Sequence, residues 1–272
     1  MKQSRFYKYN NYKLIKLIKM KISIDKVDQT NFIGFVNRLK VIDTFVYFKI
    51  KDGVVQASAY LPQRDAVKHH RIPVDHVFAM TEGTMESAGS KELKIAFFDA
   101  SRLTDAFKQF EFGNIKAEIE FMENEEDFVA TTFRVFNDEL EIKLACSEPS
   151  LGYKDLTDSQ IKGIFNTDAA RYTFDMDYTA ISKVRSLFGL DKEETFSIST
   201  NKDGVRMKGK TYNYLVTDGF EGDDPKEVTL FKKYLALLDK EDYSANVMDN
   251  RVVLRSKDSE TLLTIATCQT AE

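Results

Sequence analysis

The feature that most constrains the fold is a hairpin-like phrase that occurs twice in distant parts of the chain. Residues 48–59 read FKIKDGVVQASA, and residues 199–210 read STNKDGVRMKGK. In each copy an Asp-Gly pair separates two strand-like runs, which is typical of antiparallel strands joined by a tight turn. In the second copy we place this turn at Asp203-Gly204. A chain that builds the same hairpin twice is expected to contain an internal repeat.

Each hairpin follows a segment whose apolar residues have helical spacing, and two more such segments occur elsewhere. The four segments are TNFIGFVNRLKVI (30–42), DASRLTDAFKQF (99–110), DYTAISKVRSLFGL (177–190) and TLFKKYLALLDK (229–240). Predicted caps are Thr30 or Asn31 for the first helix, Asp99 or Ser101 for the second and Asp177 for the third.

The order strand, helix, strand and hairpin thus occurs four times. Strands outnumber helices and hairpin turns dominate, which predicts antiparallel sheets with helices on one side, an α+β fold. Residues 146–167 show no sustained strand alternation and include Pro149 and two glycines. We interpret this stretch as a connector between two halves. The expected domains are residues 20–147 and 169–272, joined by residues 148–168.

The four helical segments carry mainly Lys and Arg opposite their apolar stripes. The candidate DNA-facing residues are Arg38, Lys40, Arg102, Lys108, Lys183, Arg185, Lys232 and Lys233. Acidic residues gather in strands and loops instead, as in EIEFMENEEDF and GFEGDDPKE. Basic helices on one side of a sheet would form one positive surface, which attracts a phosphate backbone without reading bases. The alternative is that these cations are ordinary solvated helix residues.

The first 19 residues carry six cations and no acidic residue, whereas the whole chain has a net charge of −4. The remaining residues therefore carry −10. A lysine recurs every few residues, so this segment lacks the uninterrupted apolar core of a signal peptide. We interpret residues 1–19 as a disordered leader or an upstream extension, before a first strand that starts at Met20. The alternative is a basic arm that contacts nucleic acid.

Two cysteines, Cys146 and Cys268, lie in apolar, strand-like runs. This usage indicates buried thiols and a reducing compartment, and we expect a cytoplasmic location (the host cell cytoplasm if the protein is viral). No apolar run is long enough to span a membrane, so we expect no membrane partner.

The whole pattern resembles the sliding clamps of DNA replication, a family that includes proliferating cell nuclear antigen and the clamps of large tailed phages. ARYTFDMDYTAISKVRSLFGLDKEETFSISTNKDGVRMKGKTYNYLV (170–216) is similar to the start of the second clamp domain. KEVTLFKKYLALLDKEDYSANVMDNRVVLRSKDSETLLTIATC (226–268) is similar to its closing half, and residues 21–147 match more loosely. The resemblance covers nearly all of the chain beyond the leader and rests on pattern. It implies the DNA clamp fold, with sheets outside and helices inside.

The resemblance also implies a homotrimeric ring in which two-domain subunits close head to tail around duplex DNA without sequence specificity. Residues 139–147 of one subunit would pair with residues 211–218 of the next. The interface candidates are Glu139, Leu140, Ile142, Leu144, Tyr212, Tyr214 and Val216. The alternative is that both segments are internal strands.

The partners that the resemblance implies are a replicative DNA polymerase, which the ring tethers as a processivity factor, and an ATP-dependent clamp loader. Partner peptides of the family insert beneath the connector. The partner-binding candidates are Leu151, Tyr153, Leu156 and Ile161, with the C-terminal TIATCQTAE as an alternative.

Motifs for catalysis or metal binding are not evident. His69, His70 and His76 in HHRIPVDH do not have the spacing of a zinc site, and we expect them in a surface loop. The acidic residues 218–227 lack the ligand order of a calcium loop. No Gly-x-Ser-x-Gly or Gly-rich phosphate loop occurs, so we expect neither an enzyme nor a cofactor. Two alternatives stay open: a monomeric DNA-binding processivity factor of the same fold, and a non-catalytic virion assembly protein.

Overall fold

The computed structural model describes residues 19–82, 89, 91–110, 114–123, 127–151, 156–222 and 227–268. The predicted leader therefore lies outside the described residues, except for Lys19. That residue begins the first strand, one position before the predicted start. Within the described part, no helix is long and apolar enough to cross a membrane.

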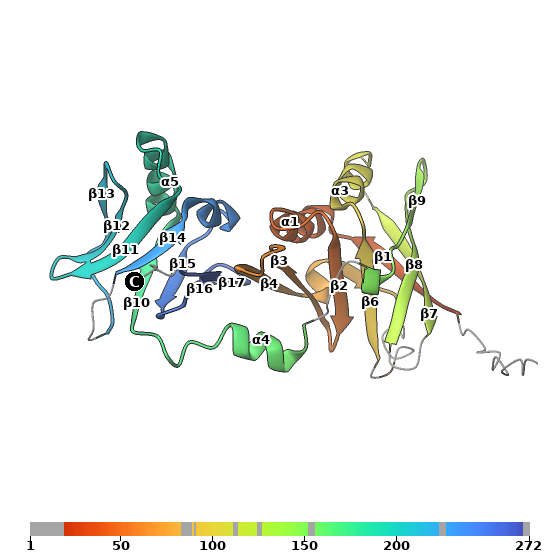
Figure 1. The fold of residues 1–272 in the computed structure, drawn as a ribbon. Helices are drawn as coiled ribbons and strands as arrows, with labels where there is room; N and C mark the ends of the chain where they lie inside the picture. The colour runs from red at the N-terminus through yellow and green to blue at the C-terminus, as the bar shows by residue number, and fades with distance from the viewer. Residues whose placement is uncertain are drawn as a thin grey trace, which may run out of the picture.

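In the described part of the first half, α-helices alternate with strands (Figure 1). Its elements are β1 (Lys19–Val27), α1 (Gln29–Lys40), β2 (Val46–Lys51), β3 (Val54–Tyr60), β4 (Ala66–Pro73), η1 (Val74–His76), β5 (Phe78–Met80), β6 (Glu92–Phe97), α3 (Ala100–Lys108), β7 (Lys116–Glu123), β8 (Asp127–Phe136) and β9 (Glu141–Ala145).

The segment after β9 contains η2 (Pro149–Leu151) and α4 (Asp158–Ile164), and then the order of strands and helices begins again. The second half consists of β10 (Tyr172–Met176), α5 (Tyr178–Leu187), η3 (Phe188–Leu190), β11 (Thr195–Asn201), β12 (Gly204–Lys208), β13 (Asn213–Thr217), β14 (Val228–Phe231), η4 (Lys232–Leu237), β15 (Tyr243–Val247), β16 (Arg251–Ser256) and β17 (Glu260–Ala266).

One sheet runs through both halves of the molecule. Its strand order is β10-β15-β16-β17-β4-β3-β2-β6-β8-β7-β1-β5, and β9 pairs with β8. The two halves join where β17 pairs with β4 in antiparallel register, with Leu263 opposite Lys68. A second sheet has the order β13-β12-β11-β14. Pairing is antiparallel throughout the described strands except between β6 and β8.

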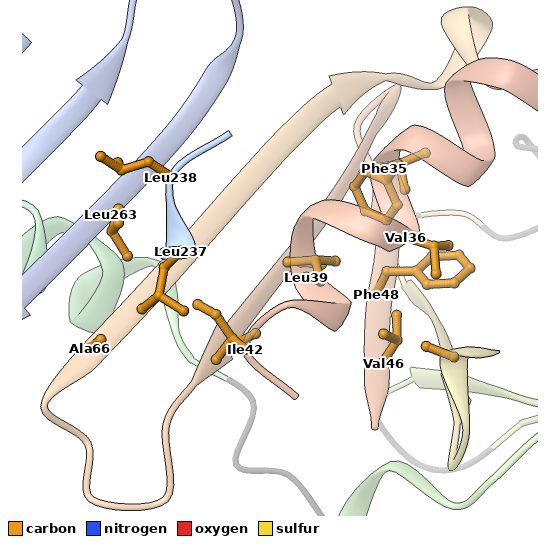
Figure 2. Close-up of a cluster of buried hydrophobic side chains, with 14 of the residues drawn as sticks. Phe35, Val36, Leu39, Ile42, Val46, Phe48, Ala66, Leu237, Leu238 and Leu263 are labelled. Atoms are coloured by element: carbon orange, nitrogen blue, oxygen red, sulfur yellow. The ribbon is translucent and has the colours of Figure 1, made fainter. Parts of the chain in front are cut away.

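Figure 1 shows α1, α3 and α5 on one side of the sheets, and α4 on the opposite side. The apolar faces of α1, α3 and α5 enter one continuous core that extends from Ile22 to Ile265. Figure 2 shows its central part, where Leu39 and Ile42 of the first half meet Leu237 and Leu238 of the second. The α+β architecture with helices on one side, predicted from the sequence, is confirmed.

Short polar residues start the helices, because their side chains satisfy backbone N–H groups that have no partner in the first turn. The Asp99 carboxylate accepts a hydrogen bond from the Ser101 N–H, and the Asp177 carboxylate accepts one from the Ala180 N–H. The cap of α1 is Asp28, which accepts from the Asn31 N–H, so the prediction of Thr30 or Asn31 was wrong.

The two hairpins that revealed the repeat use different turns. The first has two loop residues, Asp52 and Gly53, both with positive φ (48° and 73°), as a twisted two-residue turn requires. In the second, Asn201 pairs with Gly204, so the predicted turn position was one residue too late. Gly204 has a φ of 124°, and a Cβ there would lie 2.1 Å from the Thr217 carbonyl oxygen. Close approach of β13 therefore requires a glycine at this position.

The fourth predicted α-helix is not present. Phe231 ends β14 and pairs with Thr195, and residues 232–237 form the 3-10 helix η4. No side chain caps this element, and two lysines in its first turn oppose the helix dipole. Tyr234 and Leu237, like Leu235 and Leu238, are three residues apart and all four are buried, which matches the three-residue period of a 3-10 helix.

Candidate functional site

The predicted DNA-facing cations lie on four elements: α1, α3, α5 and η4. Three of the eight are half-buried and bind groups from distant segments of the chain. The Arg38 guanidinium forms ion pairs with Asp239 (3.1 Å) and Glu241 (2.5 Å) across the junction of the two halves. This pairing joins α1 to the segment between η4 and β15, so Arg38 stabilises the junction.

Arg185 and Lys232 hold neighbouring turns of the second half together. The Arg185 guanidinium donates to the carbonyl oxygens of Leu235 (3.0 Å) and Leu238 (2.9 Å) at the end of η4. Burial lowers the pKa of Arg185. Lys232 is 12% exposed and forms an ion pair with Asp191. Both head groups are bound within the chain: that of Arg185 donates to carbonyl oxygens, and that of Lys232 pairs with a carboxylate.

The charged groups of the other five cations are accessible to solvent. Arg102 is 86% exposed, with Asp99 at 3.9 Å, and Lys108 pairs with Asp105 at 2.9 Å on the helix surface. Lys233 approaches Asp65 at 3.4 Å but stays half-exposed. For Lys183, and for the half-buried Lys40, no described carboxylate lies within ion-pair distance. These residues belong to the elements on the helical side of the sheets (Figure 1).

The two strands predicted to form a subunit interface are edge strands. Among the described strands, β9 pairs only with β8, and β13 pairs only with β12. Figure 1 shows them at opposite ends of the molecule. Each edge leaves backbone N–H and C=O groups available to another strand. The prediction that one edge pairs with the other edge of a second copy is thus compatible with the topology.

Side chains on these edges divide between the core and the surface. Leu140, Ile142 and Leu144 before and along β9 are half-buried against the core, as are Tyr214 and Val216 of β13. Tyr212, before β13, has its ring 6.4 Å from that of Phe188. Glu139 and Glu141 are exposed, and so is Leu215 at 38%. Leu215 thus lies exposed on the edge strand β13.

A hollow of about 500 Å³ lies beside the connector helix α4. Its lining comes from the β3–β4 hairpin, the connector and the start of β16. The lining residues are Tyr60, Arg64, Val67, Leu156, Gln160, Gly163, Ile164 and Arg251. A concave, mainly apolar site with a few polar groups at its edge is suited to a ligand or a peptide side chain.

Of the four predicted partner-binding residues, Leu156 lines this hollow. Ile161 lines a second hollow of about 310 Å³. Leu151 ends η2, and neither its side chain nor any part of Tyr153 belongs to the described structure. Sequence reasoning missed Tyr60, Arg64, Val67 and Arg251, because they come from strands far from the connector in sequence.

The sequence did contain a signal for α4 that was overlooked. Thr157 and Gln160 form a capping box: the Thr157 hydroxyl accepts from the Gln160 N–H, and the Gln160 side chain accepts from the Thr157 N–H. Ile161 and Ile164 pack near Phe165, Met248 and Val253, so α4 is attached to the sheet rather than suspended between the halves.

His69 and His70 are not in a surface loop as predicted. Both lie in β4, which pairs with β3 and β17, and they are 2% and 4% exposed. The His70 ring lies 5.3 Å from that of Phe35 of α1, and the His69 ring lies 6.1 Å from that of Phe165 at the end of α4, so both faces of the strand are covered. Ser58 Oγ lies 2.8 Å from His69 Nδ1, and Thr261 Oγ1 lies 2.9 Å from His70 Nδ1. Within the described residues, no cluster of three potential metal ligands forms.

Cys146 and Cys268 are half-buried and follow β9 and β17. Burial raises the pKa of Cys146 to about 12. At neutral pH its thiol is therefore protonated and a poor nucleophile.

The arrangement of sheets, helices and edges is that of the PCNA sliding clamps. No protein-family model matches the sequence, and no curated protein matches it. Among solved structures, the chain is similar to PCNA of A. fulgidus bound to the C-terminal region of FEN-1, with 15% identity and a TM-score of 0.63 over 92% of this chain and 100% of that one.

Two further similar structures are PCNA from Thermococcus kodakaraensis and the PCNA2–PCNA3 complex from Sulfolobus tokodaii. The first has 14% identity and a TM-score of 0.62 over 91% of this chain and 99% of that one. The second has 10% identity and a TM-score of 0.61 over the same shares. At these identities the likeness establishes the fold, and the predicted clamp fold is confirmed.

Proposed function

We propose that this protein is a sliding clamp: three copies close head to tail into a ring that encircles duplex DNA. The observation that carries the proposal is the placement of the edge strands β9 and β13 at opposite ends of a molecule whose helices α1, α3 and α5 lie on one side (Figure 1). Pairing of β9 with β13 of the next copy would satisfy both edges. A heterologous contact of this kind generates a closed ring when the rotation permits it.

The helical side of each subunit would face the DNA. Exposed cations from three α-helices and from η4 would supply diffuse, exchangeable contacts with phosphates. The five residues that we assign to this role are Lys40, Arg102, Lys108, Lys183 and Lys233. Because a closed ring is held by topology, these contacts can be weak, and the duplex can slide through.

The hollow beside α4 would bind peptides of partner proteins. A. fulgidus PCNA was solved with the C-terminal region of FEN-1 bound to it, which supports a peptide-binding role for a fold of this kind. Here the partners would be a DNA polymerase, whose processivity rises because tethering keeps it at a high effective concentration, and an ATP-dependent loader. The protein itself would act without catalysis, in the cytoplasm.

The test uses linear duplex DNA with a biotin at each end. Rings thread onto open ends, and streptavidin is then added to block both ends. We expect the protein to stay on blocked DNA after a wash at high salt and to leave when a restriction enzyme cuts the duplex. Light scattering of the free protein should give three times the mass of the chain.

Other outcomes would favour the alternatives. A monomeric DNA-binding processivity factor would dissociate at high salt whether or not the ends are blocked, since only ionic contacts hold it. A virion assembly protein would show no retention at all, and charge reversal on its helices would leave its function intact. Either result would refute the clamp.

A further inference from the structure

The hollow beside α4 combines an apolar floor with positive charge at its edge. Tyr60, Val67 and Leu156 contribute apolar surface, and Arg64 and Arg251 are its charged residues. Neither arginine has a described carboxylate within ion-pair distance, and among the described residues no acidic side chain lines this hollow. The Arg251 guanidinium donates to the carbonyl oxygens of Gly163 (3.4 Å) and Asn166 (3.2 Å). In a chain whose net charge is −4, this is a local excess of positive charge.

The positive charge continues past α4 into the second hollow. Lys51, Arg71 and Lys162 line it together with two carboxylates, Asp52 and Asp158. Lys51 pairs with Glu92 at 3.1 Å, and Arg71 approaches Glu260 at 3.7 Å. Lys162 is exposed on α4, and no described carboxylate lies within ion-pair distance of it. Among the described cations that line this hollow, Lys162 is therefore the one available to pair with a carboxylate of a partner.

Arg64 occupies a backbone conformation that arginine rarely adopts. Its φ is 59°, in the left-handed region, within the turn that joins β3 to β4. Glycine or asparagine would adopt this conformation at less cost. The Arg64 guanidinium lies 5.8 Å from the centre of the Tyr60 ring, at the edge of the hollow.

The two hollows lie on different sides of α4, and Leu156 and Ile161 line a small space between them. We propose that the groove they form together recognises an acidic peptide: an apolar side chain of the partner enters beside Leu156 and Val67, and carboxylates on either side of it pair with Arg64 and Lys162. This inference rests on the proposed peptide-binding role of the clamp. The position of the groove on the molecule indicates whether protein or DNA would occupy it. Since α4 lies opposite the helices that would face DNA (Figure 1), the groove is placed to meet a protein.

Complementary charge at the rim would select partners more than it would add affinity. A peptide with basic residues beside its apolar anchor would meet Arg64 and Lys162 as like charges. Such repulsion disfavours wrong partners, and attraction speeds association with the right ones. The groove would thus discriminate between partner peptides that share the same apolar residues.

The experiment is selection of random 12-residue peptides, displayed on phage, against the full chain. The peptides that are enriched should carry a net negative charge together with at least one large apolar residue. Synthetic copies should bind with an affinity that falls as salt rises, because exposed ion pairs are screened. A copy with Lys in place of each Asp or Glu should bind at least tenfold more weakly.

The matched variants are R64N with K162Q in the groove, and K26Q with K202Q elsewhere. Both pairs remove two exposed positive charges. The groove pair should weaken binding of the selected peptide about three- to tenfold, because each rim contact contributes little by itself. The remote pair should leave binding within twofold. Asn tolerates the left-handed region, so the groove pair should unfold at the same denaturant concentration as the parent or at a higher one.

Selection of neutral or basic peptides would overturn the proposal, and so would an absence of enriched sequences or equal effects of the two variant pairs. Reduced DNA retention in the groove pair, with unchanged peptide binding, would assign these cations to DNA and would also overturn it. The proposed clamp function has a separate readout. Retention on end-blocked DNA is expected even if the acidic-peptide inference is wrong, and a loss of this retention would refute the clamp function.

Discussion

At the scale of single residues, buried polar groups concentrate where the two halves of the chain meet. The Lys68 ammonium, fully buried in β4, donates to the Leu237 carbonyl oxygen (3.0 Å) and to the Asp239 carboxylate (2.8 Å). The Asp239 carboxylate also forms an ion pair with Arg38 of α1. Burial lowers the pKa of Lys68. A buried charge that is paired in this way specifies one docking geometry, because any other leaves it without a partner.

Replacement of Lys68 by alanine should therefore destabilise the junction. The variant leaves the Leu237 carbonyl oxygen and part of the Asp239 carboxylate buried and unpaired, and it creates a cavity beside Leu263. We expect the free energy of unfolding to fall by about 3 kcal/mol. Urea denaturation measures this change, with K202A on an exposed turn as the control, which should cost less than about 0.5 kcal/mol. A K68A value as small as that of K202A would contradict the structural role.

The two buried histidines predict a loss of stability at mildly acidic pH. Burial, with nearby Arg71 and Arg38, lowers the pKa of His69 to about 4 and that of His70 to about 3. In the unfolded chain both histidines take up a proton near pH 6.5. In the folded chain His69 does so only near pH 4 and His70 only near pH 3. The stabilisation is therefore complete above about pH 6.5 and is lost as pH falls toward about 4, by up to about 1.4 kcal/mol per pH unit for each histidine.

Urea denaturation at a series of pH values between about 7.5 and 5 tests this dependence, in a range above the ordinary pKa of carboxylates. H69Q with H70Q should flatten the dependence, because glutamine can hydrogen bond but does not titrate. H76Q changes the exposed histidine of η1 and should keep the parental slope. An unchanged slope in the double variant would show that other groups control acid stability.

At the scale of elements, the two edge strands β9 and β13, each paired on one side only among the described strands, determine what the molecule can assemble into. Their backbones are available for pairing, and Gly204 allows β13 to approach β12 closely enough to stay in the sheet. An exposed edge is a risk of aggregation unless another strand covers it. The proposed ring removes that risk by pairing each edge with its counterpart on the next copy.

L215K should therefore favour the monomer. Leu215 is 38% exposed on β13, so a lysine there disturbs little of the subunit itself but places a charge at the proposed contact. Light scattering over a dilution series should show a lower mean mass for L215K than for the parent at the same concentration. V41K, which changes an exposed residue at the end of α1, should keep the parental mass. Equal masses for all three proteins at every dilution would place the interface elsewhere.

At the scale of the whole molecule, the β17–β4 pairing continues one sheet through both halves, so backbone hydrogen bonds join the halves in addition to the connector. The continuous core in Figure 2 supports the same conclusion. The helical side of the molecule presents Arg102 and Lys183 from different halves. Separation of the cations over the length of the molecule suits a ring that holds DNA loosely at many points.

R102Q with K183Q should separate electrostatic from topological binding. Loss of two phosphate contacts per subunit should weaken binding to open-ended duplex and reduce the slope of log affinity against log salt by about 2 if one subunit contacts the DNA at a time. Fluorescence anisotropy measures that slope. Retention on end-blocked DNA at high salt should be unchanged, because topology holds the ring there. Loss of retention together with affinity would mean that ionic contacts alone hold the protein on DNA.

The sequence by itself determined the local elements and their repetition. Apolar periodicity predicted α1, α3 and α5, and Asp99 and Asp177 were among the predicted caps, because the residues that bury a helix face and start its first turn are close together in the chain. The alternating runs and Asp-Gly pairs predicted the hairpins for the same reason. The overall resemblance to clamps followed from the order of these units, which no single residue controls.

Only the tertiary structure decided which polar residues are free and which are engaged. Arg38, Arg185 and Lys232 have the same charge as Lys183, but their partners come from segments that are remote in sequence, so no local pattern distinguishes them. The histidines of β4 are buried because Phe35 of α1 and Phe165 at the end of α4 lie against them. The groove beside α4 needs β3, β4, β16 and the connector together. Burial, pairing and concavity depend on long-range contacts, and these exist only once the chain has folded.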